Sequence, residues 1–343
     1  MKLKEILEIC YGKDQKNVEV DSSEIPILGS GGIIGYSSKY LYDKESVLIG
    51  RVGTIATPFY INKPFWTVNT LFYTKIDVTK VIPRYLYYWL LTKNLNVHRE
   101  GSAVPRLTRK NLNELELVLP PINTQQHIVN TIGSVDDLIE KKQEIILKIK
   151  EYRRIKFMKY ASLSNLEEDI LEHIELENGS QPPKEQHVYE LMPGYVRFVQ
   201  NRDYSSDVHL TYIPISKRNH LCSISDIMMD KYGDAGAIRY GIVGAFNVAL
   251  FKIIPKNFYE IEYIRDFLSQ KKIKDLLYLS SQASTRPSLN EKTFIGIKMP
   301  LLSKDILFKY QESMENILNI ELKIKNEIEK LKQIKQHLLN KYF

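Results

Sequence analysis

The chain has 343 residues, of which 43% are hydrophobic and 26% charged, and its formal net charge is +7 at pH 7. A chain of this length can bury a sizeable core and accommodate two or three domains. Its only cysteines, Cys10 and Cys222, exclude a disulfide-stapled domain and favour a reducing compartment. It contains no run of eighteen apolar residues and begins without the apolar core of a signal peptide, so we expect a cytoplasmic protein.

The positive charge is distributed unevenly. The net charge is +4 over residues 1–120, +3 over 121–163, −2 over 164–300 and +2 over 301–343. A basic chain suits a nucleic-acid partner. Because the third segment is slightly acidic, any contact with nucleic acid there must come from a local basic patch.

The first distinctive stretch is "PILGSGGIIGY", residues 26–36, in which glycines follow a short apolar run. A dinucleotide-binding loop requires G-x-G-x-x-G between a strand and a helix, but Ile34 stands at the third glycine position. The residues that follow alternate and turn like β-structure. We therefore predict a tight β-turn rather than a phosphate-binding loop.

Strand-like runs follow over residues 47–61, "VLIGRVGTIATPFYI", and 65–76, "FWTVNTLFYTKI". An aromatic helix is predicted over 82–95, with Pro83 in its first turn. A long proline-free helix is predicted over 124–160, and it carries an a/d heptad stripe of apolar residues. The stripe consists of Ile128, Ile132, Val135, Ile139, Ile146 and Ile149.

The same order of elements then returns. "ILEHIELENGS" (170–180) matches "LKEILEICYGK" (3–13), an aromatic helix is predicted over 260–279, and "VRFVQNRDYSS" (196–206) replaces the glycine stretch. Arg106 and Arg286 lie 180 residues apart, which predicts equivalent positions for them. The chain ends in a second heptad stripe, which consists of Tyr310, Met314, Ile317, Ile324, Ile328, Leu331 and Leu338.

This order predicts an α+β protein with two similar mixed α/β domains, 1–120 and 164–300, separated and joined by two long helical segments, 121–163 and 301–343. Two helices that each leave an apolar stripe uncovered are expected to form an antiparallel coiled coil with pseudo-two-fold symmetry. Two ordinary core helices are the alternative.

Catalytic signatures are missing from the sequence. No [DNS]-P-P-aromatic motif of an amino-methyltransferase, no P-D…[DE]-x-K nuclease cluster and no zinc spacing of the seven histidines is present. We therefore predict no catalytic residues, no metal site and no cofactor bound by this chain. This pattern favours a recognition protein over an enzyme.

A protein with two similar modules can place two reading heads on double-stranded DNA, which has local two-fold symmetry. Arg and Lys suit guanine edges and phosphates, while Asn and Gln suit adenine. Loop residues of these types and their neighbours are the candidates for DNA contact. In the first module they are Gly31, Gly32, Tyr36, Arg51, Thr54, Ser102, Arg106, Thr108, Arg109 and Lys110. In the second module they are Gln200, Asn201, Arg202, Lys231, Tyr232, Ser284, Thr285, Arg286 and Ser288.

The order module–helix–module–helix, with "IPILGSGGIIGY", "SVLIGRVGTIA" and "GSAVPRLTRKNLNELELVLPPINTQQHIV", resembles the specificity (S) subunit of Type I restriction-modification systems. The resemblance covers essentially the whole chain and implies a non-catalytic target-recognition subunit. It implies that each domain binds half of an interrupted DNA motif and that the helices dock two methyltransferase subunits, with restriction subunits joining them. S-adenosylmethionine, ATP and Mg would belong to those partners.

Two other function classes stay open at this point. The second module is slightly acidic, which is also compatible with a non-catalytic scaffold or adaptor whose repeated modules bind protein. An enzyme with an unrecognised site is the third hypothesis.

Overall fold

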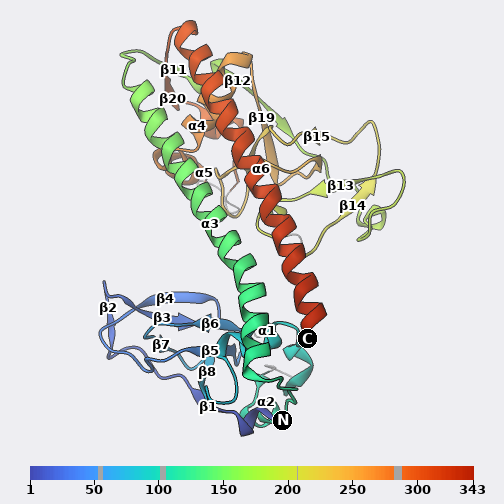
Figure 1. Cartoon of the computed structure of the whole chain (residues 1–343). Coiled ribbons are helices and arrows are strands. Elements are labelled where there is room, and N and C mark those ends of the chain that lie inside the picture. Colours follow the sequence, from blue (N-terminus) through green and yellow to red (C-terminus); the bar gives the residue numbers. More distant parts are fainter. Residues whose placement is uncertain (53–56, 101–105, 207, 282–287) are drawn as a thin grey trace. The chain divides into compact units, whose positions relative to one another are not determined.

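The computed structural model describes residues 1–52, 57–100, 106–206, 208–281 and 288–343. The chain divides into two compact units (Figure 1). The first unit combines Met1–Lys141 with Ile328–Phe343, and the second consists of Lys142–Glu327. Within the described residues, no helix is both long enough and apolar enough to cross a lipid bilayer.

Two long helices contribute to both units. Helix α3 spans Ile122–Ala161 and helix α6 spans Lys304–Tyr342, as the two heptad stripes predicted. In the second unit Lys142 pairs with Glu327, and the Arg153 guanidinium donates to the carbonyl of Met314. From Lys142 to Arg153 the residue number rises along α3, while from Glu327 to Met314 it falls along α6. The two helix segments of this unit therefore run antiparallel.

Both predicted stripes are covered in the structure. Burial is complete or nearly so at Ile128, Ile132, Val135, Tyr310, Met314, Ile324 and Ile328. It is partial at Ile139, Ile146, Ile149, Ile317, Leu331 and Leu338. Glu321 occupies one position of the second stripe with an exposed fraction of 0%. Its carboxylate accepts from the Tyr240 hydroxyl at 2.8 Å and pairs with Lys325 at 2.8 Å, which compensates the buried charge.

The first unit contains two four-stranded sheets. The antiparallel sheet has the order β1-β8-β5-β6, formed by Leu7–Tyr11, Leu71–Ile76, Ser46–Gly50 and Phe59–Ile61. The other has the order β2-β4-β3-β7, formed by Glu19–Val20, Gly32–Ser37, Ile25–Gly29 and Trp66–Thr67, and β3 and β7 pair in parallel.

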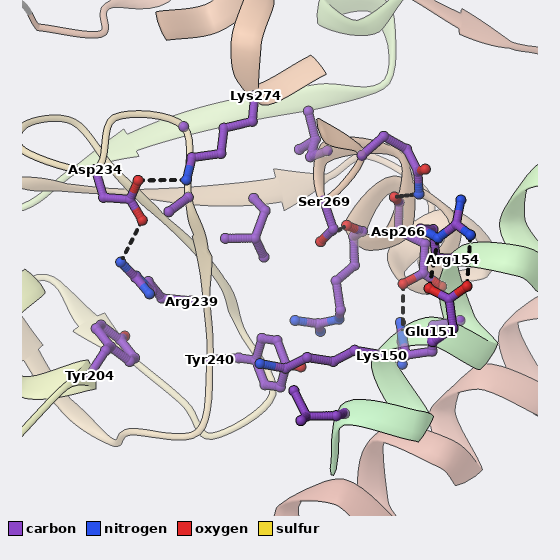
Figure 2. A pocket seen from close by; sticks show the side chains of 18 of the residues that line it. Lys150, Glu151, Arg154, Tyr204, Asp234, Arg239, Tyr240, Asp266, Ser269 and Lys274 are labelled. Carbon is purple, nitrogen blue, oxygen red and sulfur yellow. Dashed lines mark hydrogen bonds and ion pairs between the residues drawn. The ribbon is translucent and has the colours of Figure 1, made fainter. Parts of the chain in front are cut away.

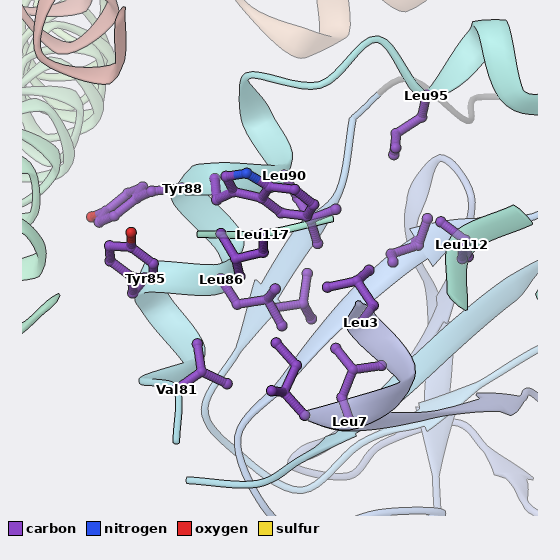
Figure 3. Packing of buried hydrophobic residues seen from close by; sticks show 14 of the residues in the cluster. Leu3, Leu7, Val81, Tyr85, Leu86, Tyr88, Leu90, Leu95, Leu112 and Leu117 are labelled. Carbon is purple, nitrogen blue, oxygen red and sulfur yellow. The ribbon is translucent and has the colours of Figure 1, made fainter. Parts of the chain in front are cut away.

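The core of the first unit lies between the antiparallel sheet and helix α1, Pro83–Leu91 (Figure 3). Tyr85, Leu86 and Leu90 of α1 pack with residues of β1 and with the N-terminal segment. Pro83 stands at the start of α1, as predicted. Leu339 of α6 belongs to the same cluster, so the last turns of the chain help to complete the core of the first unit.

The second unit repeats the antiparallel sheet, whereas its other sheet carries its fourth strand at the opposite edge. Its antiparallel sheet has the order β12-β19-β16-β17, formed by Ile174–Asn178, Leu250–Pro255, Ile227–Asp230 and Ile238–Arg239. Its other sheet has the order β14-β13-β18-β15, formed by Tyr212–Pro214, Tyr195–Val199, Gly244–Phe246 and Leu221–Cys222. Strands β13 and β18 pair in parallel, as β3 and β7 do. The predicted repeat is therefore a repeat of structure.

Shorter elements complete the two units. In the part of the chain that the structure describes, they are β9 (Arg99–Glu100), β10 (Arg106–Leu107), α2 (Arg109–Asn113), β11 (Glu167–Asp169), β20 (Lys298–Pro300) and the short 3-10 turns η1 to η7. The prediction of one continuous aromatic helix over 260–279 is wrong, because the structure has two helices there, α4 (Ile261–Leu268) and α5 (Lys271–Ser281). The Ser269 hydroxyl donates to the Arg265 carbonyl at 2.7 Å and the Gln270 amide to the Asp266 carbonyl at 2.8 Å. These bonds satisfy carbonyls of the last turn and end α4 there.

A buried ion cluster fixes α4 to both long helices. The Arg153 guanidinium of α3 pairs with Glu262 at 2.6 Å and Asp266 at 2.7 Å, and Arg153 is only 4% exposed. The Tyr310 hydroxyl of α6 donates to Asp266 at 2.7 Å. Removing one member of such a pair leaves an uncompensated buried charge, at a cost of about 3–5 kcal/mol.

Gly12 follows β1, where the backbone of the 67–68 segment approaches closely. A Cβ on Gly12 would lie 2.1 Å from the Val68 carbonyl oxygen, and one on Gly179, after β12, would lie 2.1 Å from the Asn247 carbonyl oxygen.

We predict that Gly12→Ala lowers the free energy of unfolding by roughly 1–3 kcal/mol, measured by denaturant titration. Gly31→Ala is the matched control, because a Cβ there meets nothing within 4 Å. Equal stability of the two variants would contradict the close approach.

His173 joins three short segments of the second unit. Its Nδ1 lies 2.9 Å from Glu260 and its Nε2 lies 3.0 Å from Glu168, and the hydrogen bond with Glu260 raises the pKa of His173 above its usual value. Stability that comes from a raised histidine pKa is fully present below the unfolded pKa of about 6.5 and is lost as the pH rises through the folded pKa.

We therefore predict that His173→Gln lowers the free energy of unfolding by about 1–2 kcal/mol at about pH 6 and by much less at about pH 9. Denaturant titrations at the two pH values measure this difference. Glu168→Gln is the control and should change little, because the Glu168 side chain is 48% exposed. A loss of equal size at both pH values would show that the histidine acts through packing alone.

Candidate nucleic-acid interface

The glycine stretch of the first unit forms a β-hairpin turn, as predicted. Strand β3 ends at Gly29, β4 begins at Gly32, and Gly32 has φ +116°, a conformation that side-chain-bearing residues rarely adopt. Gly31 is exposed and Tyr36 is 41% exposed on β4. Since a strand and not a helix follows the turn, this stretch is not a dinucleotide-binding loop.

The other described candidates of the first unit gather around Tyr11. The Leu107 N–H donates to the Arg51 carbonyl at 3.0 Å, which brings β10 and its exposed Arg106 beside the end of β5. The guanidinium carbons of Arg51 and Arg109 lie 5.3 Å and 5.5 Å from the Tyr11 ring centroid. Such cation–π contacts hold each guanidinium over the ring, and the Arg51 guanidinium also donates to the Asn69 carbonyl at 3.4 Å.

A helix cap orders one part of this cluster, and the backbone of residues 68–70 ties the cluster to the hairpin. Thr108 caps α2 by accepting from the Asn111 N–H, which places Arg109 and Lys110 in the first turn. The segment 68–70 holds both β3 and the residue after β5, since the Val68 N–H donates to the Leu28 carbonyl and the Arg51 N–H to the Thr70 carbonyl. We call the described candidates Gly31, Gly32, Tyr36, Arg51, Arg106, Thr108, Arg109 and Lys110 the first candidate surface.

The second candidate surface comprises the described candidates Gln200, Asn201, Arg202, Lys231, Tyr232 and Ser288. Gln200 caps the short η5 turn, Asn201–Tyr204. The Asn201 amide donates to the Tyr232 carbonyl at 3.5 Å and thereby joins this turn to the loop after β16. The Leu289 N–H donates to the Lys231 carbonyl at 3.1 Å, which brings Ser288 to the same place.

Lys231 is the cation at the centre of the second candidate surface. Its Nζ lies 4.3 Å from the Phe251 ring centroid and donates to the Asn178 side-chain oxygen at 2.8 Å. Burial lowers the pKa of Lys231. An approaching anion would offset this desolvation, since it favours the charged form of the amine.

All described candidates are at least partly exposed. The candidates Thr54, Ser102, Ser284, Thr285 and Arg286 lie outside the described residues. Because Arg286 is among them, its predicted equivalence with Arg106 stays a prediction. Leu107 bonds to Arg51 as Leu289 bonds to Lys231, so Leu107 and Leu289 hold equivalent positions. Leu107 and Leu289 lie 182 residues apart, so the repeat does not keep a constant spacing of 180.

A cavity of about 610 Å³ in the second unit is lined by Tyr204 of the η5 turn, Asp234 and Arg239, among other residues (Figure 2). Asp234 bridges Lys274 at 2.5 Å and Arg239 at 3.2 Å across one side, and Arg239 also pairs with Asp230 at 2.8 Å. Because these cations and carboxylates compensate one another, this side of the cavity is a structural ion-pair network. It fixes the loop that follows Lys231.

Sequence reasoning missed the residues beneath the two central cations. Tyr11, which is 46% exposed, packs on Phe72 with ring centroids 5.1 Å apart, and Asn178 lies opposite Phe251 in the strand register. The matching stretches 3–13 and 170–180 contained the signal, because Tyr11 and Asn178 both stand immediately before Gly12 and Gly179.

Comparisons with known proteins agree on one family. The family of the "Type I restriction modification DNA specificity domain" matches residues 1–151. The chain is 29% identical over 127 residues to the EcoprrI specificity subunit of a Type I restriction enzyme from Escherichia coli, a stretch that covers 35% of this chain and 30% of the relative. It is 26% identical over 159 residues to a putative Type I specificity subunit of Mycoplasma pneumoniae, covering 44% of each. The matched stretches thus span less than half the length of these curated relatives.

The fold also has a solved counterpart. The structure is similar to the crystal structure of a Type I restriction-modification S subunit from M. genitalium, with a TM-score of 0.63 and 18% identity, over 100% of this chain and 95% of that one. At this identity the similarity establishes the mixed α/β fold. Residues 1–151 carry the sequence match, and over them the chain is similar to the Type I restriction-modification DNA specificity domain family.

Proposed function

We propose that the chain is the sequence-specific DNA-recognition subunit of a Type I restriction-modification complex. The observation that carries this proposal is a repeated scaffold with unlike surfaces. Both units have the same order of strands in the antiparallel sheet, yet a glycine turn in the first corresponds to Gln200, Asn201 and Arg202 in the second. Two similar scaffolds that present different polar groups suit two different half-sites of one DNA motif.

In this proposal residues 1–120 and 164–300 are the two recognition domains, and 121–163 and 301–343 are helical spacers. The spacers form an antiparallel coiled coil, relate the domains by a pseudo-two-fold axis and dock two methyltransferase subunits. The chain itself is not catalytic and acts in the cytoplasm. S-adenosylmethionine, ATP and Mg act in the partner subunits, which include restriction subunits in a complete complex.

The decisive test is methylation of DNA in a cell that expresses this chain with its methyltransferase. We predict a methylated adenine in a split motif, two short specified sequences separated by a fixed number of unspecified bases. Long-read sequencing of the methylome measures it. The methyltransferase expressed alone is the control and should produce no such motif.

Two other outcomes would overturn the proposal. If neither the chain nor its complex binds DNA in a salt-dependent manner, the protein-binding scaffold becomes the better hypothesis. If the purified chain methylates DNA without a partner, it is an enzyme with an unrecognised site.

The spacer role predicts how an altered helix length changes the motif. Inserting one heptad after Lys141 of α3 and a matching heptad after Glu327 of α6 lengthens both helices by about 10 Å, or roughly three base pairs of DNA. The gap between the half-sites should grow while the specified bases stay the same, as read from the methylome. A heptad inserted in α3 alone is the control that mismatches the helices. Unchanged spacing in the double insertion would remove the spacer role.

A further inference from the structure

Arg51 and Lys231 occupy the same position in the two units. Each is the first residue after an inner strand of the antiparallel sheet, β5 in the first unit and β16 in the second. Each backbone N–H donates to a carbonyl of the neighbouring segment at 2.8 Å, and each carbonyl accepts from a buried leucine. These partners are Thr70 and Leu107 for Arg51, and Ala249 and Leu289 for Lys231.

The support beneath the two cations is also equivalent. In the strand registers Tyr11 lies opposite Phe72 and Asn178 lies opposite Phe251. Arg51 lies over the Tyr11 ring, which packs on Phe72. Lys231 lies over the Phe251 ring and donates to Asn178. A phenylalanine therefore lies at the base of both positions, and the residue opposite it holds the cation.

The turn beside each cation differs completely between the units. The Val68 N–H donates to the Leu28 carbonyl just as the Asn247 N–H donates to the Val199 carbonyl, both at 3.0 Å, so Leu28 of β3 and Val199 of β13 hold equivalent positions. After Leu28 the chain continues as Gly29-Ser30-Gly31-Gly32, a turn that presents backbone. After Val199 it continues as Gln200-Asn201-Arg202-Asp203, a turn that presents amide and guanidinium groups.

A guanidinium offers a planar fork of donors, whereas an ammonium is a point charge. Base edges distinguish these geometries, but a phosphate accepts either. A position that keeps its charge and changes its geometry therefore suits the DNA element that every half-site shares, the backbone phosphate. The adjoining turns vary in the groups that base edges distinguish.

We propose that Arg51 and Lys231 are matched phosphate anchors, one for each half-site, and that they position the two unlike turns for base recognition. This inference rests on the proposed function. The inference gives the candidates two roles. Arg51 and Lys231 contact DNA independently of its base sequence, and the adjoining turn of each domain recognises the bases.

The test uses the full chain in complex with its methyltransferase and duplexes that carry the motif, with either half-site intact or replaced by other bases. Binding is measured by fluorescence anisotropy over about 50–200 mM salt. Arg51→Met and Lys231→Met should each reduce the slope of log K against log salt by about 0.9, the value for one lost phosphate contact. Each should weaken binding to intact and replaced half-sites by the same factor. Arg51→Lys and Lys231→Arg should retain the parental slope.

Matched controls come from cations that lie over rings elsewhere in the same units. Lys93 lies 5.1 Å from the Trp89 ring centroid and Lys304 lies 5.1 Å from that of Tyr259, so Lys93→Met and Lys304→Met remove an equivalent charge and ring contact. Neither should change the slope. Thermal melts of every variant identify any loss that comes from unfolding.

Three results would overturn the inference while leaving the proposed function intact. The first is an unchanged salt slope in both methionine variants. The second is a loss confined to duplexes with an intact half-site, which indicates base recognition. The third is an Arg51→Lys variant as impaired as Arg51→Met, which shows that the fork and not the charge is needed. If the parental complex has no split motif at all, the proposed function fails before this test begins.

Discussion

The buried pairing of Arg153 with Glu262 and Asp266 is the interaction on which the second unit depends. It joins α3 to α4, and Tyr310 adds α6 to the same cluster. The guanidinium is almost inaccessible to water, so its charge is tolerable only while both carboxylates stay in place. The first unit has the same design with the charges exchanged. There the carboxylate, Asp136, lies on α3 and accepts from the Tyr88 hydroxyl of α1, while Lys335 of α6 pairs with it at 2.7 Å. Each unit is therefore closed by one segment from each long helix, although those segments lie far apart in the sequence.

This closure explains why the candidate surfaces can differ. The sheet of each unit is covered by a short helix, and that helix is fixed to the long helices by polar contacts that leave little freedom. Backbone hydrogen bonds then fix where the loops leave the sheet, and these bonds use no side chain. Side chains at the loop tips can change without disturbing the core, as binding residues on a rigid scaffold commonly do.

The sequence predicted the periodic parts of this protein and missed those that depend on partners distant in sequence. The heptad stripes located α3 and α6, and the strand-like runs 47–61 and 65–76 located β5, β6 and β8, because burial on one face leaves a period in the sequence. Ser269 and Gln270 broke a predicted helix through bonds to carbonyls, which no period records. The predicted equivalence of Arg106 with Arg286 lies outside the described residues. The hydrogen bonds of Leu107 and Leu289 relate these two leucines to each other, which a constant spacing of 180 does not do. The candidate loops were found by residue type, but the aromatic and amide groups beneath the cations required the strand register.

The two central cations show how the units diverged without losing a charge. A guanidinium is weakly hydrated and stacks well on an aromatic face, so Arg51 is matched by Tyr11. An ammonium is strongly hydrated and needs an oxygen acceptor once it is half-buried, so Lys231 is matched by the Asn178 side chain. A ring lies beneath each cation, Tyr11 for Arg51 and Phe251 for Lys231, so exchanging either cation would keep a positive charge over an aromatic face. Arg51 and Tyr11 come from different segments of the first unit, and Lys231 and Asn178 from different segments of the second. In both units the cation and its supporting residue suit each other. What the two units share at this point is therefore a positive charge held at one place, and the side chain that supplies it is free to vary together with its support.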